Sequence, residues 1–150
     1  MKHSMRMAWI AALLLAMATP VIAELGGNAA TIEVDLTHLK AMRRVVSAPK
    51  YIVHEMQTPS GTTVREYVSP RGLVFAVAWE GPFMPDLRQL LGSYYASYLN
   101  AASSRRSRRA PLQIRQADLV VHSGGHMRAF SGQAYVPQLL PADVPVDEIH

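Results

Sequence analysis

The sequence predicts an α+β fold of two layers, in which one main amphipathic helix packs on an antiparallel sheet of about five strands. Three observations predict it: segments of alternating or β-branched residues, short turns between them, and one leucine and tyrosine stripe with helical spacing. The 150 residues are 49% hydrophobic and 17% charged. That composition is typical of a folded domain and excludes a disordered chain.

The first 23 residues have the pattern of a secretory signal peptide. Lys2 and Arg6 form a positive start, residues 8–18 are an apolar run, and Ala23 ends a small-residue cleavage site. The apolar run is too short to span a bilayer, which needs about twenty such residues. We therefore expect residues 1–23 to be a signal peptide that is cleaved.

The rest of the chain is expected to form a single α+β domain over residues 24–150. It has 0 Cys, which excludes a disulfide scaffold, a thiolate metal site and a cysteine nucleophile. Loss of Lys2 and Arg6 lowers the formal net charge from +4 to +2. We expect this domain to be exported to the periplasm or secreted, without stable membrane insertion after signal cleavage.

A shorter N-terminal helix is expected over residues 35–46. Apolar residues recur every three or four positions from Ile32 to Val46, and Asp35 is a candidate N-cap. Pro49 follows and stops the helix.

Three strands are expected next, over residues 51–57, 62–68 and 73–79. The turns between them, at 59–61 and 69–72, each contain proline and glycine, which preset φ and accept positive φ respectively. The third strand is apolar at every position. It should therefore be central and covered on both faces, with Leu73, Phe75, Val77 and Trp79 on one of them.

The clearest helix is expected over residues 86–100. Its apolar residues form a single stripe: Leu87, Leu90, Leu91, Tyr94 and Tyr98. Asp86 is a candidate N-cap. Gly92 is expected to let the helix approach small residues of the sheet, Ala76 and Ala78.

Residues 112–122 and 127–136 are expected to pair as a final hairpin around Gly124-Gly125. The remaining residues, 137–150, contain prolines that exclude a helix or a central strand. We expect an extended C-terminal strap docked on the domain, or else a frayed end. The N-terminal helix and this strap are expected to cover the other edges of the sheet.

The hairpin holds one cluster of candidate metal ligands or acid–base groups, Asp118, His122 and His126. A two-residue turn at the glycines would place the two histidines on opposite faces of the sheet, where they could not share a metal. A wider loop would relax this constraint, and the alternative reading is a polar hairpin tip.

A second candidate surface is a basic run within the linker 101–111. It contains Arg105, Arg106, Arg108 and Arg109. The run is either a solvated loop or a patch that meets an anionic envelope component or an acidic partner. No aromatic residues interleave with these arginines to stack bases, and export also argues against nucleic acid.

Several motifs occur together in this chain. They are Pro-Ser-Gly at 59–61 followed by Val-Arg-Glu-Tyr at 64–67, Gly-Leu-Val-Phe-Ala-Val-Ala-Trp at 72–79, Pro-Asp-Leu-Arg-Gln-Leu-Leu-Gly at 85–92, and Ser-Gly-Gly-His-Met-Arg at 123–128. Over roughly residues 25–150 the chain resembles the bacterial exported family known as domain of unknown function 2844. The resemblance implies an exported bacterial domain and transfers no catalytic residue, ligand or cofactor.

The leading hypothesis is an exported, non-catalytic binding or accessory module of the cell envelope, because no nucleophile, base and metal set converges in the sequence. Its partner would be an envelope protein or an anionic envelope component. The candidate interaction surface is His122, His126, Arg128, Arg105, Arg106, Arg108 and Arg109. The alternatives are a hydrolase or metal-binding enzyme of unfamiliar type that uses the 118–128 hairpin, and a structural component of an envelope assembly. No cofactor, catalytic residue or metal ligand is assigned.

Overall fold

The computed structural model of the chain describes residues 24–104 and 110–150. Its helices and strands follow one another in this order: η1 (Ala29–Thr31), α1 (Ile32–Leu39), β1 (Met42–Ser47), β2 (Ile52–Gln57), β3 (Thr63–Val68), β4 (Val74–Gly81), α2 (Leu87–Leu91), η2 (Gly92–Tyr94), α3 (Tyr95–Ser103), β5 (Leu112–Arg115), β6 (Val120–His126), β7 (Ala129–Tyr135) and η3 (Val146–Glu148).

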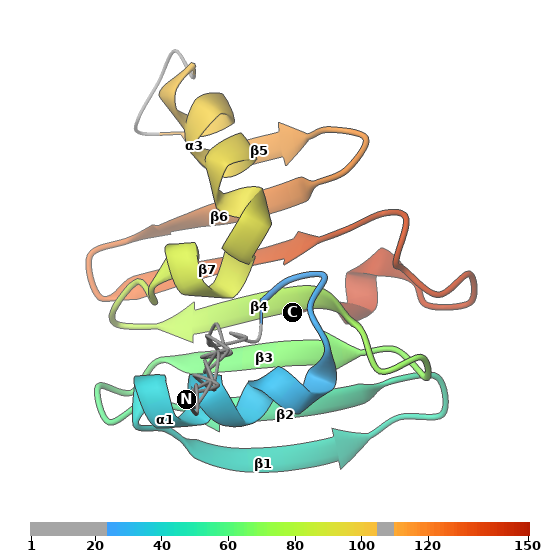
Figure 1. Ribbon diagram of the computed structural model, residues 1–150. Coiled ribbons are helices and arrows are strands. Elements are labelled where there is room, and N and C mark those ends of the chain that lie inside the picture. The colour runs from blue at the N-terminus through green and yellow to red at the C-terminus, as the bar shows by residue number, and fades with distance from the viewer. Residues whose placement is uncertain (1–23, 105–109) are drawn as a thin grey trace, which may run out of the picture.

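The α+β fold class is confirmed, and the strands form one antiparallel sheet in the order β1-β2-β3-β4-β7-β6-β5 (Figure 1). The chain runs from β4 through the helices to β5 at the far edge, and then returns through β6 to β7 beside β4. The expected number of about five strands is wrong, since the sheet has seven. The two additional strands arise as follows. Strand β1 lies largely within the segment predicted as a helix, 35–46, and the segment predicted as one strand, 112–122, contains β5 and the start of β6.

The N-terminal helix expected over residues 35–46 is wrong in its position. Helix α1 ends at Leu39, Lys40 has a φ of +49°, and Met42–Ser47 form the edge strand β1, paired with β2. The apolar period from Ile32 to Val46 therefore combined the end of a helix with a strand. The β-branched pair Val45-Val46 fits that strand.

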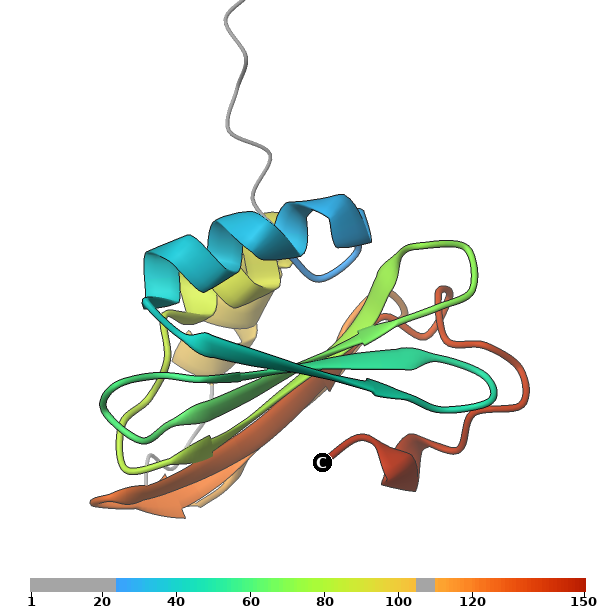
Figure 2. The same cartoon turned by 90° about the horizontal axis from the view of Figure 1, so that it is seen from below.

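The main helix expected over residues 86–100 is formed by α2, η2 and α3 together. Asp86 is confirmed as its N-cap, because its Oδ1 accepts hydrogen bonds from the backbone N–H of Arg88 (2.9 Å) and of Gln89 (3.3 Å). Helix α1 lies on the same face of the sheet as these elements, and the C-terminal segment lies on the opposite face (Figure 2). The prediction that α1 and this segment cover edges of the sheet is therefore wrong, because each lies on a face.

Strand β4 is central and buried on both faces, as predicted, but the division of its side chains differs. Val77 and Trp79 belong to the core beneath the helices, whereas Phe75, Ala76 and Ala78 belong to the core beneath the C-terminal segment. A β-bulge causes the difference, because the register with β3 shifts next to Phe75. The two alanines therefore do not lie beneath the main helix.

Gly92 has a different neighbour from the one expected. The side chain of Glu24 occupies the space that a Cβ at this position would need. Gly92 also has a φ of +49°, in the left-handed region that favours glycine. The glycine therefore accommodates the N-terminal segment and the junction of α2 with η2, and not the sheet.

The C-terminal segment, residues 137–150, is held by both apolar and polar contacts. Ile149 is fully buried in the core that it shares with Phe75. The Tyr67 hydroxyl donates to the backbone oxygen of His150 (2.8 Å), and the Tyr51 hydroxyl donates to Oε2 of Glu148 (2.7 Å). The hydrogen bond to Glu148 is the main reason why the pKa of Tyr51 rises to about 12. The pKa of Tyr67 is raised chiefly by burial.

Candidate functional site

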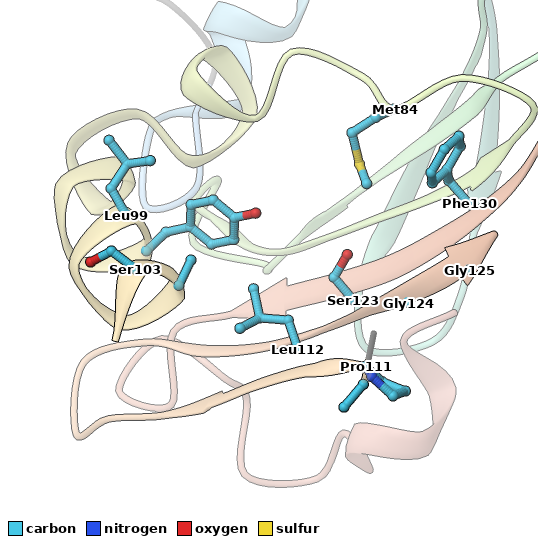
Figure 3. Close-up of a pocket in the computed structure, with 12 residues that line it drawn as sticks. Met84, Leu99, Ser103, Pro111, Leu112, Ser123, Gly124, Gly125 and Phe130 are labelled. Atoms are coloured by element: carbon cyan, nitrogen blue, oxygen red, sulfur yellow. The ribbon is translucent and has the colours of Figure 1, made fainter. Parts of the chain in front are cut away.

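A groove of about 520 Å³ lies between helix α3 and the ends of strands β5, β6 and β7. We call it the α3 groove. Its lining residues come from five parts of the chain: Met84, Tyr98, Leu99, Ala102, Ser103, Ala110, Pro111, Leu112, Ser123, Gly124, Gly125 and Phe130. Figure 3 shows side chains from these parts pointing toward one space, with the hydroxyl of Ser123 rising from the sheet.

Helix α3 forms one wall of the groove because its first turn is fixed by aromatic contacts. The rings of Tyr95 and Tyr98 stack at a centroid distance of 5.9 Å, and the guanidinium of Arg88 lies 5.4 Å from the centroid of the Tyr95 ring. The next residue, Leu99, is 46% exposed and lines the groove. The wall therefore presents an aliphatic side chain to solvent beside a fixed aromatic pair.

Strand β6 forms the floor, and two glycines allow close approach to its backbone. Gly125 has a φ of +117°, and a Cβ there would lie 2.7 Å from Cα of Phe130 on β7. Gly132 on β7 is restricted by packing instead, because a Cβ there would lie 2.6 Å from Cε2 of the Trp79 indole and 2.8 Å from the backbone oxygen of His122. These positions need glycine for backbone geometry and packing. As a result, the glycine pair 124–125 lines a concave surface.

The lining of the α3 groove is largely apolar, with a few hydroxyl and backbone polar groups. Among the described residues that line it, none carries a carboxylate, imidazole, ammonium or guanidinium group. The polar groups are hydroxyls and the backbone of β6, and the walls are apolar. Such a mixture of apolar walls with few polar groups is typical of ligand sites.

The structure separates the residues that were predicted to form a cluster. The final hairpin is present, since β6 pairs with β7, but its predicted turn is wrong: the glycines lie within β6, and Met127 and Arg128, which has a φ of +65°, form the turn. His122 is half-buried on β6 and His126 is exposed at its end. They are four residues apart on one face, roughly 13 Å along the strand. Asp118 is exposed in the turn before β6.

These positions do not bring Asp118, His122 and His126 together. No group of three or more potential metal ligands occurs in residues 24–104 and 110–150. Within the same ranges, no helix is both long and apolar enough to cross a membrane. The predicted interaction residues in the basic run, Arg105, Arg106, Arg108 and Arg109, lie outside the described residues, as does the predicted signal peptide.

The sequence reading missed the apolar residues of the groove. Met84, Leu99 and Phe130 come from separate segments, and only the fold brings them together. One feature of the sequence could have indicated the groove. Leu99 lies outside the leucine and tyrosine stripe of the main helix, so it is not expected to pack in the protein core. An exposed leucine alone is common, whereas three exposed or half-exposed large apolar residues on one groove form a surface.

A buried acidic residue beneath the helices was also missed. Glu66 is 0% exposed, and His54 lies directly across from it on β2. Burial lowers the pKa of His54, and the positive charge of Arg43 lowers it further. His54 is therefore neutral at pH 7, and this pair lies in the core, away from the α3 groove.

Comparisons with known proteins bear on the family alone. Neither the curated proteins nor the solved structures contain a chain that matches this one. The profile of a family described as "Protein of unknown function (DUF2844)" matches residues 21–149. This range contains every strand of the sheet and all residues that line the α3 groove. Since the match covers most of the sequence and agrees with the resemblance of its motifs, the chain belongs to the DUF2844 family.

Proposed function

We propose that this protein is exported and acts in the cell envelope as a binding module without catalysis of its own, with the α3 groove as its binding surface. The observation that carries the proposal is the chemistry of that groove. Catalysis by acid–base or nucleophilic groups needs titratable side chains within hydrogen-bond reach of one another. The groove instead offers apolar walls over a floor of hydroxyls and backbone.

The occupant we propose is a segment of an envelope protein that places an apolar side chain in the groove and acidic residues beside it. An apolar anchor buried in a preformed pocket is the usual centre of a protein interface. Ser103 and Ala110 both line the groove. The sequence between them contains four arginines: Arg105, Arg106, Arg108 and Arg109. Their positive charge complements acidic residues that flank the anchor.

Site-specific photocrosslinking in living cells tests the groove. A photoreactive amino acid at Leu99 is expected to give a discrete adduct, while the same group at Ile52 on β2 gives none. The two positions are matched in exposure, at 46% and 40%. Met84→Glu should abolish the adduct, because it places a charge against the apolar anchor. Adducts of equal yield at both positions, or an adduct at Leu99 that survives Met84→Glu, would reject the groove as the binding surface.

The acidic character of the partner is tested with the partner identified from that adduct. Changing all four arginines to serine is expected to weaken its binding at least tenfold at low salt, and less at high salt. An affinity that neither the arginines nor salt alter would show that the partner is recognised through its apolar anchor alone.

Export is tested separately from binding. The chain recovered from the periplasm or medium is expected to begin at Glu24, as measured by intact-protein mass. Ala23→Asp should block cleavage, since small residues are required at that position. A full-length chain found only in the cytoplasm would reject export.

A further inference from the structure

A second hollow, of about 410 Å³, lies on the other face of the same strands. We call it the polar groove. The side chains that matter for its chemistry are Glu80, Gln113, His122, Ser131 and Gln133, with His150 at one end. It has different chemistry from the α3 groove, although β6 contributes to both.

The strand register brings these polar side chains together. His122 on β6 lies directly across from Gln113 on β5 and from Gln133 on β7. Ser131 on β7 lies directly across from Glu80 on β4. Opposite residues on neighbouring strands have Cβ atoms about 4.5–5.5 Å apart, so the five side chains form two adjacent rows on one face.

The C-terminal segment leaves this part of the sheet uncovered. Its buried residue Ile149 packs with Phe75 on β4, and His150 then borders the groove. Beyond that border Glu80, Gln113 and Ser131 are exposed. Gly124 has no side chain and keeps the floor low at this point, where a Cβ would make an ordinary contact of 3.6 Å with Pro111.

The hydrogen-bonding groups of the polar groove suit hydroxyls. Two amides, an imidazole and a hydroxyl each offer both a donor and an acceptor, and Glu80 adds acceptors. A sugar hydroxyl likewise donates and accepts. Nε2 of His122 is buried and has no hydrogen-bond partner within the described residues, and a turn of this half-buried imidazole toward the groove would let a ligand hydroxyl satisfy it.

The charge of the polar groove disfavours an anion. Among the described residues that line it there is no lysine or arginine, and Glu80 is negative. Arg65 lies on the same face, but its Nε donates to Oε2 of Glu55 (2.9 Å) and its Nη1 to the backbone oxygen of His150 (3.1 Å). Arg115 also lies on this face, two positions from Gln113 on β5, but it does not line the groove, so a phosphate or carboxylate inside it would meet the carboxylate of Glu80 and no lining cation.

We propose that the polar groove binds an uncharged saccharide, held by Gln113, His122 and Gln133 in one row and by Glu80 and Ser131 in the next. The open shape across three strands favours a short oligosaccharide over a single enclosed sugar. Pro111, Leu112, Ser123 and Gly124 border both hollows, but the five polar side chains named here line only the polar groove, and Met84 and Leu99 line only the α3 groove.

Titration calorimetry of the exported chain tests this proposal with three trisaccharides. Tri-N-acetylated chitotriose and cellotriose are uncharged, and trigalacturonate is an anionic trisaccharide. At least one uncharged trisaccharide is expected to bind at a single site, with trigalacturonate at least tenfold weaker. Backbone amide shifts in NMR spectra should concentrate at residues 113, 122 and 131–133. No binding of either uncharged trisaccharide, or tighter binding of trigalacturonate, would overturn the proposal.

Variants assign the binding to this face. The double change Gln113→Ala with Gln133→Ala should weaken binding at least tenfold. The matched control Gln57→Ala removes an exposed amide from β2, three strands from β7, and should leave binding unchanged. Ser131→Trp is a second test, because it fills the groove from an exposed position. Binding that survives these changes in folded protein, or that Gln57→Ala weakens equally, would overturn the assignment. Leu99→Glu should leave saccharide binding unaffected, so this proposal and the proposed function fail separately.

Discussion

Replacing Gly125 by alanine is expected to destabilise the protein strongly, whereas the same change at its neighbour Gly124 should cost little. Gly125 has a φ of +117°, and a Cβ there would press against the carbonyl group of Ala129 and lie 2.7 Å from Cα of Phe130. Both contacts are backbone atoms of β7 and cannot move without breaking its pairing with β6. At Gly124 a Cβ would lie 3.6 Å from Pro111, an ordinary contact.

The expected magnitudes follow from these two environments. A non-glycine residue in a sparsely populated backbone region costs about 1–3 kcal/mol, and forcing an atom into a packed site adds about 1–3 kcal/mol. Gly125→Ala should therefore lower the free energy of unfolding by roughly 2–6 kcal/mol. Gly124→Ala should be neutral or stabilise by up to about 1 kcal/mol, since alanine restricts the unfolded chain. The two variants should differ by at least about 2 kcal/mol.

Urea unfolding followed by far-ultraviolet circular dichroism measures this difference. The two variants change the same atoms at adjacent positions, so each is the control for the other. Equal free energies of unfolding would refute the register in which the glycines lie within β6, as would a larger loss for Gly124→Ala. They would favour the predicted alternative, a hairpin turn at 124–125.

Three further changes test the C-terminal segment and the core. Ile149→Ala should lower the free energy of unfolding by about 3 kcal/mol, as expected for a buried isoleucine, and an unchanged urea curve would mean that this segment is not docked. The folded-state pKa of His54 is lowered from 6.5, so the unfolded chain binds more protons below about pH 6.5 and stability should fall as the pH drops through that region. His54→Gln should reduce this pH dependence in urea titrations, and a dependence that stays the same would assign it to other groups. The Tyr51 pKa of about 12 exceeds the ordinary value of 10.0, so its contribution to stability is complete below pH 10 and is lost as the pH rises through 12. Tyrosinate absorbance should show this late ionisation, and Glu148→Gln should return it toward the ordinary value; a late ionisation that persists would contradict the hydrogen bond as its cause.

Local signals predicted the middle of the fold well. Strands β2, β3 and β4 are separated by turns whose proline and glycine residues determine the chain reversals, and Asp86 marks the start of the main helix by capping it. Each of these features depends on residues within four positions of one another. These features can therefore be predicted from sequence without knowing how distant segments pair.

The predictions failed where two local patterns were compatible with the same residues. Ile32 to Val46 satisfies a helical period, yet the positive φ of Lys40 divides it into α1 and β1. The pair 124–125 has the composition of a turn, yet β7 needs glycine at Gly125 inside a strand. In both cases pairing with a distant strand decided the outcome, and periodicity contains no information about that partner.

The α3 groove could not be predicted for the same reason. Leu99 and Phe130 are separated by thirty positions in sequence, and they meet because the chain passes from α3 to the sheet edge at β5 before β6 and β7 return toward its centre. The sequence identified the segment 122–128 as a working surface, and its glycines do line the groove. The predicted interaction residues of this segment were its histidines, however, and neither His122 nor His126 lines the α3 groove.

The two grooves together explain why the stretch from His122 to His126 lacks the alternation of polar and apolar residues that usually identifies a strand. Alternate residues of β6 point to opposite faces, so Ser123 and Gly125 face the α3 groove and His122 and Gly124 face the polar groove, although Ser123 and Gly124 border both hollows. Neither face at this end of β6 is packed core, so a large apolar residue at every second position would have no core to pack into. Small residues, Ser123, Gly124 and Gly125, keep the floors of both hollows low. A strand with two open faces therefore has the composition of a turn, and this accounts physically for the misassigned turn.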